Sequence, residues 1–207
     1  MILDKKTYKL DGNKYYDAVS DKHQIVVGHT GVVNMNHINT WNNRLNGSYK
    51  KTAPFTIALD GTVYEHYDPK FYSDFTSEKN LNRFIIPIVL ENEGWLIKDI
   101  KNNRYLNWLG NIYNREDSVV TKKWRGKEYW APYSDAQFDS LLELLDYLCG
   151  KFKITKETIG YNTKVDNIIG YNGISVKSNY STEFTDLSPA WDFVKFKNNL
   201  EGINIKK

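Results

Sequence analysis

The pattern of apolar and polar positions predicts strands and helices that alternate along the chain. Short runs rich in β-branched and aromatic residues, each bounded by polar or turn-forming residues, indicate strands. These strands are expected at 24–28, 54–59, 62–67, 84–90 and 159–161. The second and third form a hairpin, because the Asp60-Gly61 dipeptide between them tolerates the positive φ of a tight turn.

Apolar residues that recur at three- and four-residue steps predict three helices. They are expected over 36–45, 134–152 and 189–200, the last with Ser188 as its cap and Pro189 at its first position. The middle helix is the clearest, because Ser134 and Gln137 form a capping box in front of a continuous apolar face. Cys149 lies on that face, which favours core packing over a catalytic thiol. The interleaved order predicts an α/β fold with a mixed sheet flanked by helices.

One stretch, 93–133, fits this scheme least well. It contains four of the six tryptophans, interleaved with tyrosines and basic residues. We interpret the chain as a single domain, 1–207, with this stretch as an inserted Trp/Tyr-rich lobe. Its aromatic residues could form a small core for the lobe, a ligand-stacking wall, or anchors for a protein partner.

Composition excludes several classes of protein. Lys and Arg total 28 and Asp and Glu total 25, so the net charge of +3 gives no argument for a nucleic-acid partner. The longest apolar run, 84–90, is far too short to span a membrane. The charged N-terminus lacks the apolar region of a signal peptide, which predicts a chain made in the cytoplasm. The single cysteine excludes an internal disulfide framework and a CxxC metal site.

The ordered set of motifs resembles the zinc-dependent N-acetylmuramoyl-L-alanine amidases of the type 2 amidase and peptidoglycan-recognition-protein class. The resemblance runs over roughly residues 22–200. The matching segments are 26–31 (VVGHTG), 55–64 (FTIALDGTVY), 86–92 (IPIVLEN), 133–138 (YSDAQF), 159–162 (IGYN) and 185–193 (TDLSPAWDF). It implies an amidase-like central mixed sheet, and the aromatic lobe is no part of the common pattern. A phage-encoded origin would fit such a chain.

The resemblance implies a zinc site that lacks one of its three protein ligands. These amidases hold zinc with two histidines and one Asp or Cys, and leave a fourth position for the attacking water. His29 matches the first ligand and Asp186 the third. The second histidine should follow Gly160, where Tyr161 and Asn162 stand instead, and neither is a normal zinc ligand. We therefore expect no cofactor, and zinc only if His29 and Asp186 still bind it.

The proton-handling residues implied by the resemblance are also missing. The family uses a Glu on the central strand or a Tyr before the hairpin, and Val89 and Ala53 stand at those places. Glu91 lies two residues beyond Val89, on the same face of the strand, so it is the candidate catalytic residue. The basic residue that usually precedes the third ligand is absent, since Phe184 and Thr185 stand there.

A binding groove can be expected even without catalysis. Its candidate residues are His29, Thr30, Tyr161, Asn162, Asn179, Tyr180 and Trp191. The polar run 171–180 is interpreted either as the floor of that groove or as a plain loop. His23, His37 and His66 could in principle rebuild a metal site, but a packing or surface role is favoured for each.

Three functions stay open at this point. The first is a degenerate amidase that binds a muropeptide or another small polar ligand without zinc hydrolysis. The second is a divergent active amidase, such as a phage wall hydrolase, in which Tyr161 or another histidine completes the zinc site and Glu91 acts as base. The third is a structural or host-factor-binding protein whose aromatic lobe contacts a protein partner. No nucleic acid and no membrane is expected as a partner.

Overall fold

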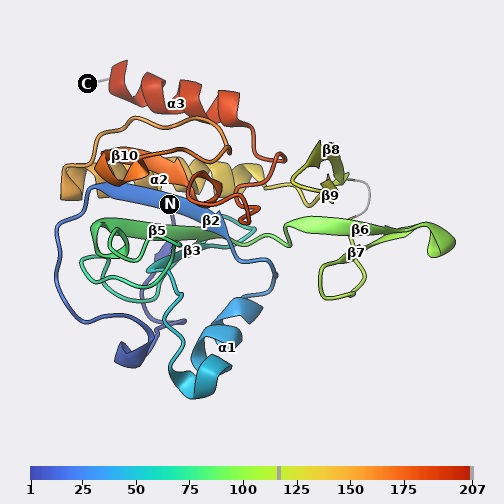
Figure 1. Ribbon diagram of the computed structural model, residues 1–207, viewed down its shortest axis with the longest axis horizontal. Helices are drawn as coiled ribbons and strands as arrows, with labels where there is room; N and C mark the ends of the chain where they lie inside the picture. Colours follow the sequence, from blue (N-terminus) through green and yellow to red (C-terminus); the bar gives the residue numbers. More distant parts are fainter. Residues whose placement is uncertain (116–117, 206–207) are drawn as a thin grey trace.

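The computed structural model describes residues 1–115 and 118–205 and is built around a six-stranded mixed sheet (Figure 1). In spatial order the strands are β1 (Leu3–Asp4), β4 (Val63–Glu65), β3 (Phe55–Ile57), β5 (Ile85–Leu90), β2 (Gln24–His29) and β10 (Gly173–Val176). Neighbouring strands are parallel, except that β3 and β4 form the antiparallel hairpin that the Asp60-Gly61 turn predicts. The expected α/β class with a central mixed sheet is confirmed.

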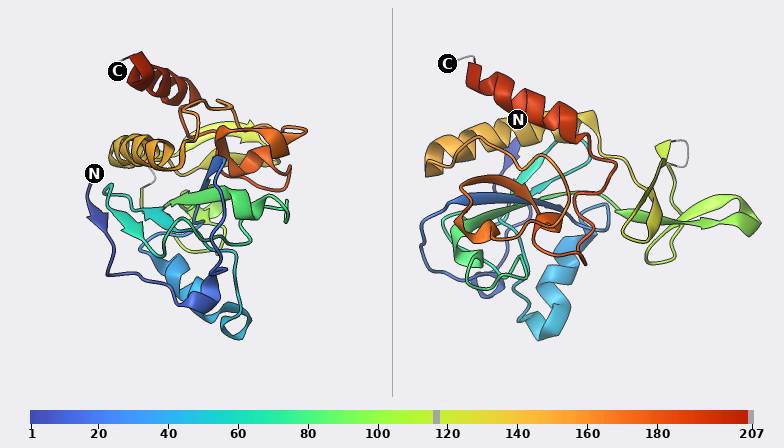
Figure 2. Two further views of the ribbon diagram at one scale, coloured as in Figure 1. Left: turned by 90° about the vertical axis from the view of Figure 1, so that its left-hand side faces the viewer. Right: turned by 45° about the horizontal axis from the view of Figure 1, so that its top comes forward.

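Helices cover both faces of this sheet. Helices α2 (Asp135–Phe152) and α3 (Phe193–Ile205) lie on one face, and α1 (Asn36–Asn43) lies on the other (Figures 1 and 2). Strand β2 serves both cores, because Ile25 and Val27 pack under α2 while Val26 packs with the α1 side. Short 3-10 turns occur at Gly12–Lys14, Arg44–Gly47, Asn82–Phe84, Ile100–Asn102, Ile168–Gly170 and Lys177–Asn179. Among the described residues, no helix has both the length and the apolar character needed to cross a membrane.

The start of α2 is tied to the ends of two central strands. Ser134 caps the helix and forms the predicted capping box with Gln137. The Gln137 side-chain amide also donates to the carbonyls of Ile57 (3.1 Å) and Glu91 (2.8 Å), and the Ser134 hydroxyl donates to that of Leu59 (2.6 Å). These bonds fix the helix over the ends of β3 and β5. The buried Cys149 packs in the core beneath α2, as expected.

A second, antiparallel sheet projects from the main body (Figure 1). Its strands, in spatial order, are β7 (Arg104–Asn107), β6 (Trp95–Asp99), β9 (Lys127–Trp130) and β8 (Val120–Trp124). They all lie within 93–133, and we call this sheet with its loops the aromatic lobe. A small core of Leu96, Tyr113 and Ala131 holds it together, and Trp130 is completely buried.

Near the C-terminus one predicted strand is wrong, and the predicted last helix is present with later bounds. Residues 159–161 form no strand, because the chain turns at Gly160 (φ +74°) and only Thr158 makes a bridge to Ile174. The last sheet strand is β10, which lies within the polar run 171–180, where the sequence predicts groove floor or loop. The last helix begins four residues later than predicted, because the side chain of Asp192 accepts the backbone N–H of Lys195 (2.8 Å) and so caps it.

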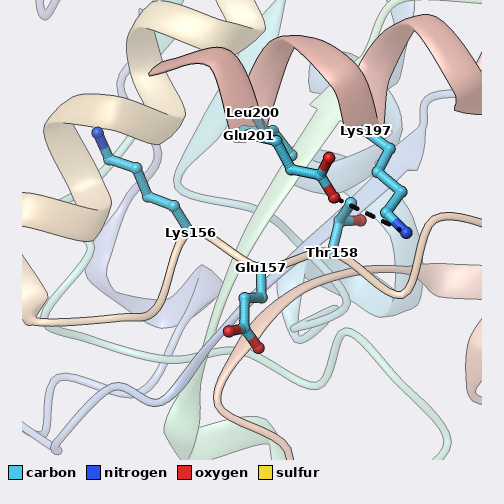
Figure 3. A pocket seen from close by; sticks show the side chains of 6 residues that line it. All are labelled: Lys156, Glu157, Thr158, Lys197, Leu200 and Glu201. Atoms are coloured by element: carbon cyan, nitrogen blue, oxygen red, sulfur yellow. Dashed lines mark ion pairs between the residues drawn. The ribbon is translucent and has the colours of Figure 1, made fainter. Parts of the chain in front are cut away.

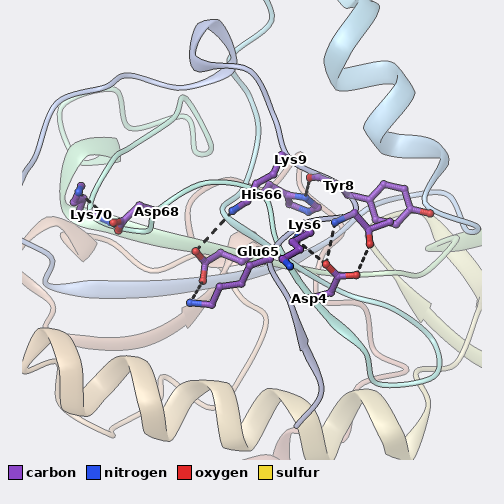
Figure 4. Close-up of polar contacts among 10 residues, drawn as sticks. Asp4, Lys6, Tyr8, Lys9, Glu65, His66, Asp68 and Lys70 are labelled. Atoms are coloured by element: carbon purple, nitrogen blue, oxygen red, sulfur yellow. Dashed lines mark hydrogen bonds and ion pairs between the residues drawn. The ribbon is translucent and has the colours of Figure 1, made fainter.

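Two buried histidines form a chain of hydrogen bonds with a fixed direction. His66 Nδ1 lies 2.6 Å from the carbonyl of Tyr8, so Nδ1 must donate (Figure 4). His66 Nε2 then accepts from the Thr56 hydroxyl (2.8 Å), and the Thr56 oxygen in turn accepts from His37 Nε2 (3.0 Å). This direction requires a neutral His66 ring. In the part of the chain that the structure describes, the buried Nδ1 of His37 has no hydrogen-bond partner, so a proton there would be unfavourable. Burial lowers the pKa of His66 to about 4 and that of His37 to about 3.

This chain predicts a loss of stability in acid. Because both folded-state pKa values lie below the ordinary 6.5, the unfolded chain binds more protons as the pH falls. The contribution of the pair is complete above pH 6.5 and is lost as the pH falls through about 4 for His66 and toward about 3 for His37. His66 alone accounts for about 3 kcal/mol at pH 4.

Urea unfolding at several pH values tests this expectation. His66→Gln should be less stable than the wild type at neutral pH, but its stability should fall less steeply in acid. His23→Gln, which changes an exposed histidine, should follow the wild-type curve. If the free energy of unfolding falls equally steeply with decreasing pH in the wild type and in His66→Gln, the lowered pKa of His66 is contradicted.

Candidate functional site

A pocket lies where the carboxyl ends of β2 and β10 meet the aromatic lobe. His29 ends β2, and Lys177 directly follows β10. Since Val176 pairs with Val27 in the parallel register, Lys177 emerges beside Gly28. The pocket has a volume of about 240 Å³ and is lined by His29, Thr30, Gly31, Glu93, Gly94, Trp95, Trp108, Lys177, Thr185 and Asp186.

The absence of a side chain at Gly28 lets Asp186 reach the sheet. A Cβ at Gly28 would lie 2.5 Å from Asp186 Oδ2, 3.2 Å from the Phe75 ring and 3.4 Å from Lys177 Cδ. The same carboxylate oxygen accepts the backbone N–H of His29 (3.2 Å). Three side chains from distant parts of the chain thus converge over one glycine.

A second glycine makes room for the imidazole of His29. Gly94 has φ +76°, and a Cβ there would lie 2.6 Å from His29 Cε1. The buried Tyr133 hydroxyl lies 3.4 Å from His29 Nδ1 and accepts the backbone N–H of Ser188 (3.4 Å), so its own proton is available to His29. Burial lowers the pKa of His29, Asp186 opposes this effect and Lys177 adds to it. His29 is therefore a neutral hydrogen-bonding group at neutral pH.

The ammonium group of Lys177 is held by one carboxylate and two aromatic rings. Its Nζ lies 3.9 Å from Asp186 Oδ2 and 4.7 Å from the ring centres of both Phe75 and Phe184. The Lys177 side chain is 21% exposed and that of Asp186 only 7%. An ammonium has no lone pair to offer a metal ion. Within residues 1–115 and 118–205, no group of three or more His, Cys, Asp or Glu side chains could hold a metal.

A larger groove adjoins this pocket between α1 and the aromatic lobe. It has a volume of about 460 Å³ and shares Glu93 with the first pocket. Its walls include six asparagines, namely Asn34, Asn36, Asn39, Asn107, Asn111 and Asn114. Trp108, about half exposed, borders the pocket and donates from Nε1 to the carbonyl of Gly31 (2.6 Å). Burial raises the pKa of Glu93, while a hydrogen bond from Asn107 opposes that effect.

Arg125 fastens the other side of the aromatic lobe to the loop that carries Asp186. It sits in the turn between β8 and β9. Its guanidinium donates to four backbone carbonyls, those of Asn162, Ser178, Ser181 and Phe184. Because guanidinium nitrogens bond to several carbonyls at once in a fixed geometry, this contact sets the path of residues 178–184 beside the pocket.

Another cavity, of about 380 Å³, lies between α3 and the segment before β10 (Figure 3). It is lined by Lys156, Glu157, Thr158, Lys197, Leu200 and Glu201. Lys197 pairs with Glu201 within the same helix (3.8 Å), and Lys156 pairs with Asp146. Its basic side chains are thus already matched by acidic ones, and it shares no residue with the pocket of His29.

The structure brings together only part of the predicted site. His29, Thr30 and Asp186 line the pocket. Tyr161 and Asn162 do not: the Tyr161 side chain is exposed, and the Asn162 amide donates to the carbonyl of Leu187 (3.2 Å). The position beside His29 that they were expected to fill belongs to Lys177.

The other expected groove residues form hydrogen bonds or packing contacts inside the protein and do not line the pocket. Asn179 donates to the carbonyls of Tyr161 (2.9 Å) and Thr163 (2.7 Å), Tyr180 donates to Gln24, and Trp191 packs against α2 and α3. Glu91, the expected base, does not line the pocket. Its two oxygens accept the backbone N–H groups of Met35 (2.6 Å) and Leu59 (3.2 Å).

Comparisons with known proteins agree with this architecture. A family model described as N-acetylmuramoyl-L-alanine amidase matches residues 19–179. The chain is similar in fold to the N-acetylmuramoyl-L-alanine amidase LysC from Clostridium intestinale URNW, with a TM-score of 0.57 and 16% identity, over 96% of this chain and 97% of that one. It is also similar to a structure of tracheal cytotoxin bound to the ectodomain complex of peptidoglycan recognition proteins LCa and LCx, with a TM-score of 0.50 and 11% identity over 94% of each chain. No curated protein matches the sequence significantly.

The crowding at His29 predicts an unequal effect of two alanine substitutions. Gly94 and Gly110 both have positive φ, but a Cβ at Gly110 would meet nothing within 4 Å. Both variants should lose about 1 kcal/mol to backbone strain. Gly94→Ala should lose about 1–3 kcal/mol more, because the His29 ring must move. Urea unfolding measures both losses, and imidazole NMR resonances report the ring; equal losses with an unchanged His29 signal would contradict the geometry.

The hydrogen bonds of Arg125 predict that the order of the loop that carries Asp186 depends on its contact with the aromatic lobe. Arg125→Ala leaves partly buried carbonyls without donors, so it should lower the free energy of unfolding by about 1–3 kcal/mol. Hydrogen exchange should also rise in residues 178–186. Lys123→Ala, an exposed change on the same hairpin, is the control and should leave both measurements unchanged. Exchange confined to the hairpin would argue against coupling.

Proposed function

The chain belongs to the N-acetylmuramoyl-L-alanine amidase family, and on that premise we propose that it binds a peptidoglycan fragment in the pocket of His29 without zinc-dependent hydrolysis. The observation that carries the proposal is the set of side chains at the pocket. One imidazole and one carboxylate lie beside an ammonium group, where zinc would need a third electron-pair donor.

The hydroxyl beside His29 does not supply the missing donor either. Asp186 Oδ2 faces the Lys177 ammonium, which would repel a metal cation. The Tyr133 hydroxyl is buried, which raises its pKa and keeps its proton on. These residues do not fit a zinc ion, so we derive no metal-dependent step.

The shape and polarity of the groove support a muropeptide as ligand. A muropeptide carries amides, sugar hydroxyls and acetamido groups, all of which both donate and accept hydrogen bonds. Apart from the buried Asn107, whose side chain bonds to Glu93 and to the backbone of Leu109 and Asn111, the asparagines along the larger groove offer the same pair of functions, because each side-chain amide has two N–H donors and one carbonyl. Trp95 and Trp108 border the adjoining pocket. Trp108 offers a flat apolar face for a sugar ring, whereas Lys127 Nζ lies 3.6 Å from the centre of the Trp95 ring and covers one of its faces. The LCa and LCx neighbour, which shares this fold, binds tracheal cytotoxin.

Within this function, His29 acts as a hydrogen-bonding partner for the ligand. Its ring is neutral, Gly94 packs against one edge, and Tyr133 satisfies Nδ1. Glu93 and Lys177 add one acceptor and one donor to the same pocket. The arrangement recognises a polar ligand and supplies no activated water.

Calorimetric titration with a purified disaccharide-peptide muropeptide tests the proposal. We expect saturable binding, with the muropeptide recovered intact by mass spectrometry after incubation with and without added zinc. Trp108→Ala should weaken binding by roughly tenfold or more, because it removes an aromatic wall of the pocket.

The matched control for this titration is Ile100→Ala. Ile100 is 83% exposed and lines neither the pocket nor the groove, so binding should be unchanged. A wild-type protein that does not bind the muropeptide would overturn the ligand. Release of free peptide would instead show an active amidase.

A further inference from the structure

We propose that the Lys177 ammonium is a resident cation that takes the place of a metal ion and holds Asp186 in the pocket. The inference rests on the proposed function in one respect, namely that the pocket works without zinc. It goes further by naming the group that replaces the metal and by predicting that one substitution restores a metal site.

The position of Lys177 follows from the sheet. Strand β10 pairs with β2 in a fixed parallel register, so the first residue after β10 lies at the same sheet edge as His29. Asp186 contacts both sides of this junction, through the His29 backbone N–H (3.2 Å) and through the Lys177 ammonium (3.9 Å). The Lys177 ammonium therefore lies within the same constellation as the imidazole and the carboxylate, and the Arg125 guanidinium adds a coulombic attraction to Asp186.

The surroundings of the ammonium are those of a built cation site. Phe75 and Phe184 come from two separate loops and place their rings 4.7 Å from Lys177 Nζ. The negative faces of aromatic rings stabilise a partly desolvated cation. Asp186 is the third group around the ammonium. Its carboxylate compensates the charge of Lys177, so the ammonium does not require an external anion.

This pairing also explains why Asp186 can stay buried. An unpaired carboxylate with only 7% exposure would be costly, and in a metal site the ion supplies the compensating charge. Here the protein supplies that charge itself. A zinc ion brought to His29 and Asp186 would face like-charge repulsion from Lys177 and would find one donor too few.

The geometry predicts that Lys177→His completes a zinc site. An imidazole at position 177 reaches about as far as Lys177 Cδ, which lies over Gly28 beside the Asp186 carboxylate. The substitution removes the competing charge and adds a third donor, so that His29, Asp186 and the new side chain together fit the ligand set of a catalytic zinc ion.

Zinc titration calorimetry on the full chain, with zinc content measured after dialysis, tests the inference. The wild type and Lys177→Gln, which removes the charge without adding a donor, should bind no stoichiometric zinc. Lys177→His should bind one zinc ion at least roughly 100-fold more tightly than the wild type, and His29→Ala in that background should abolish the gain. Lys122→His adds a histidine at an exposed site on β8 and should behave like the wild type.

Each result decides the question independently of muropeptide binding. Stoichiometric zinc in the wild type that depends on His29 would overturn the inference, and so would a folded Lys177→His variant without a gain. Circular dichroism of each metal-free variant checks folding, and Lys177→Cys supplies the third donor if Lys177→His does not fold. If the wild-type protein binds neither zinc nor the muropeptide, the proposed ligand is wrong, but the role of Lys177 is unaffected.

Discussion

The parallel pairing of β10 with β2 is the constraint on which the rest of the pocket depends. This pairing sets Val176 opposite Val27, and the residues that follow each strand then meet at one edge of the sheet. His29 and Lys177 reach the pocket through this register, and the loop after β10 returns Asp186 to the backbone of His29. A shift of one residue would turn Lys177 to the opposite face of the sheet and leave Asp186 without its cation.

Small residues make this convergence possible. Gly28 leaves space for Asp186, and Gly94 leaves space for the imidazole of His29. The charges then balance locally, because one ammonium lies beside a buried carboxylate and the imidazole is neutral. The pocket is thus preorganised by backbone geometry and by the pairing of Asp186 with Lys177.

The sequence predicts the central elements because they carry strong local signals. The capping box at Ser134, the Asp-Gly turn and the apolar runs of β2 and β5 all specify structure within a few residues. Strand β10 has only four residues and polar neighbours, so no local signal separates it from a loop. Because β10 is missed, the site is also predicted with the wrong residue. With the last strand placed at 159–161, Tyr161 is expected beside His29, and Lys177 is not considered. Only tertiary pairing shows which residue follows the strand that adjoins β2.

The aromatic lobe is attached to the body on both sides of the opening. Trp108 bonds to Gly31 on one side, and Arg125 bonds to the carbonyls around Asp186 on the other. These two attachments hold the lobe in place and so fix the width of the opening of the His29 pocket in the absence of a ligand. The proposed ligand would then require little ordering of loops on association, which favours discrimination by ligand thickness over adaptation to ligands of different size.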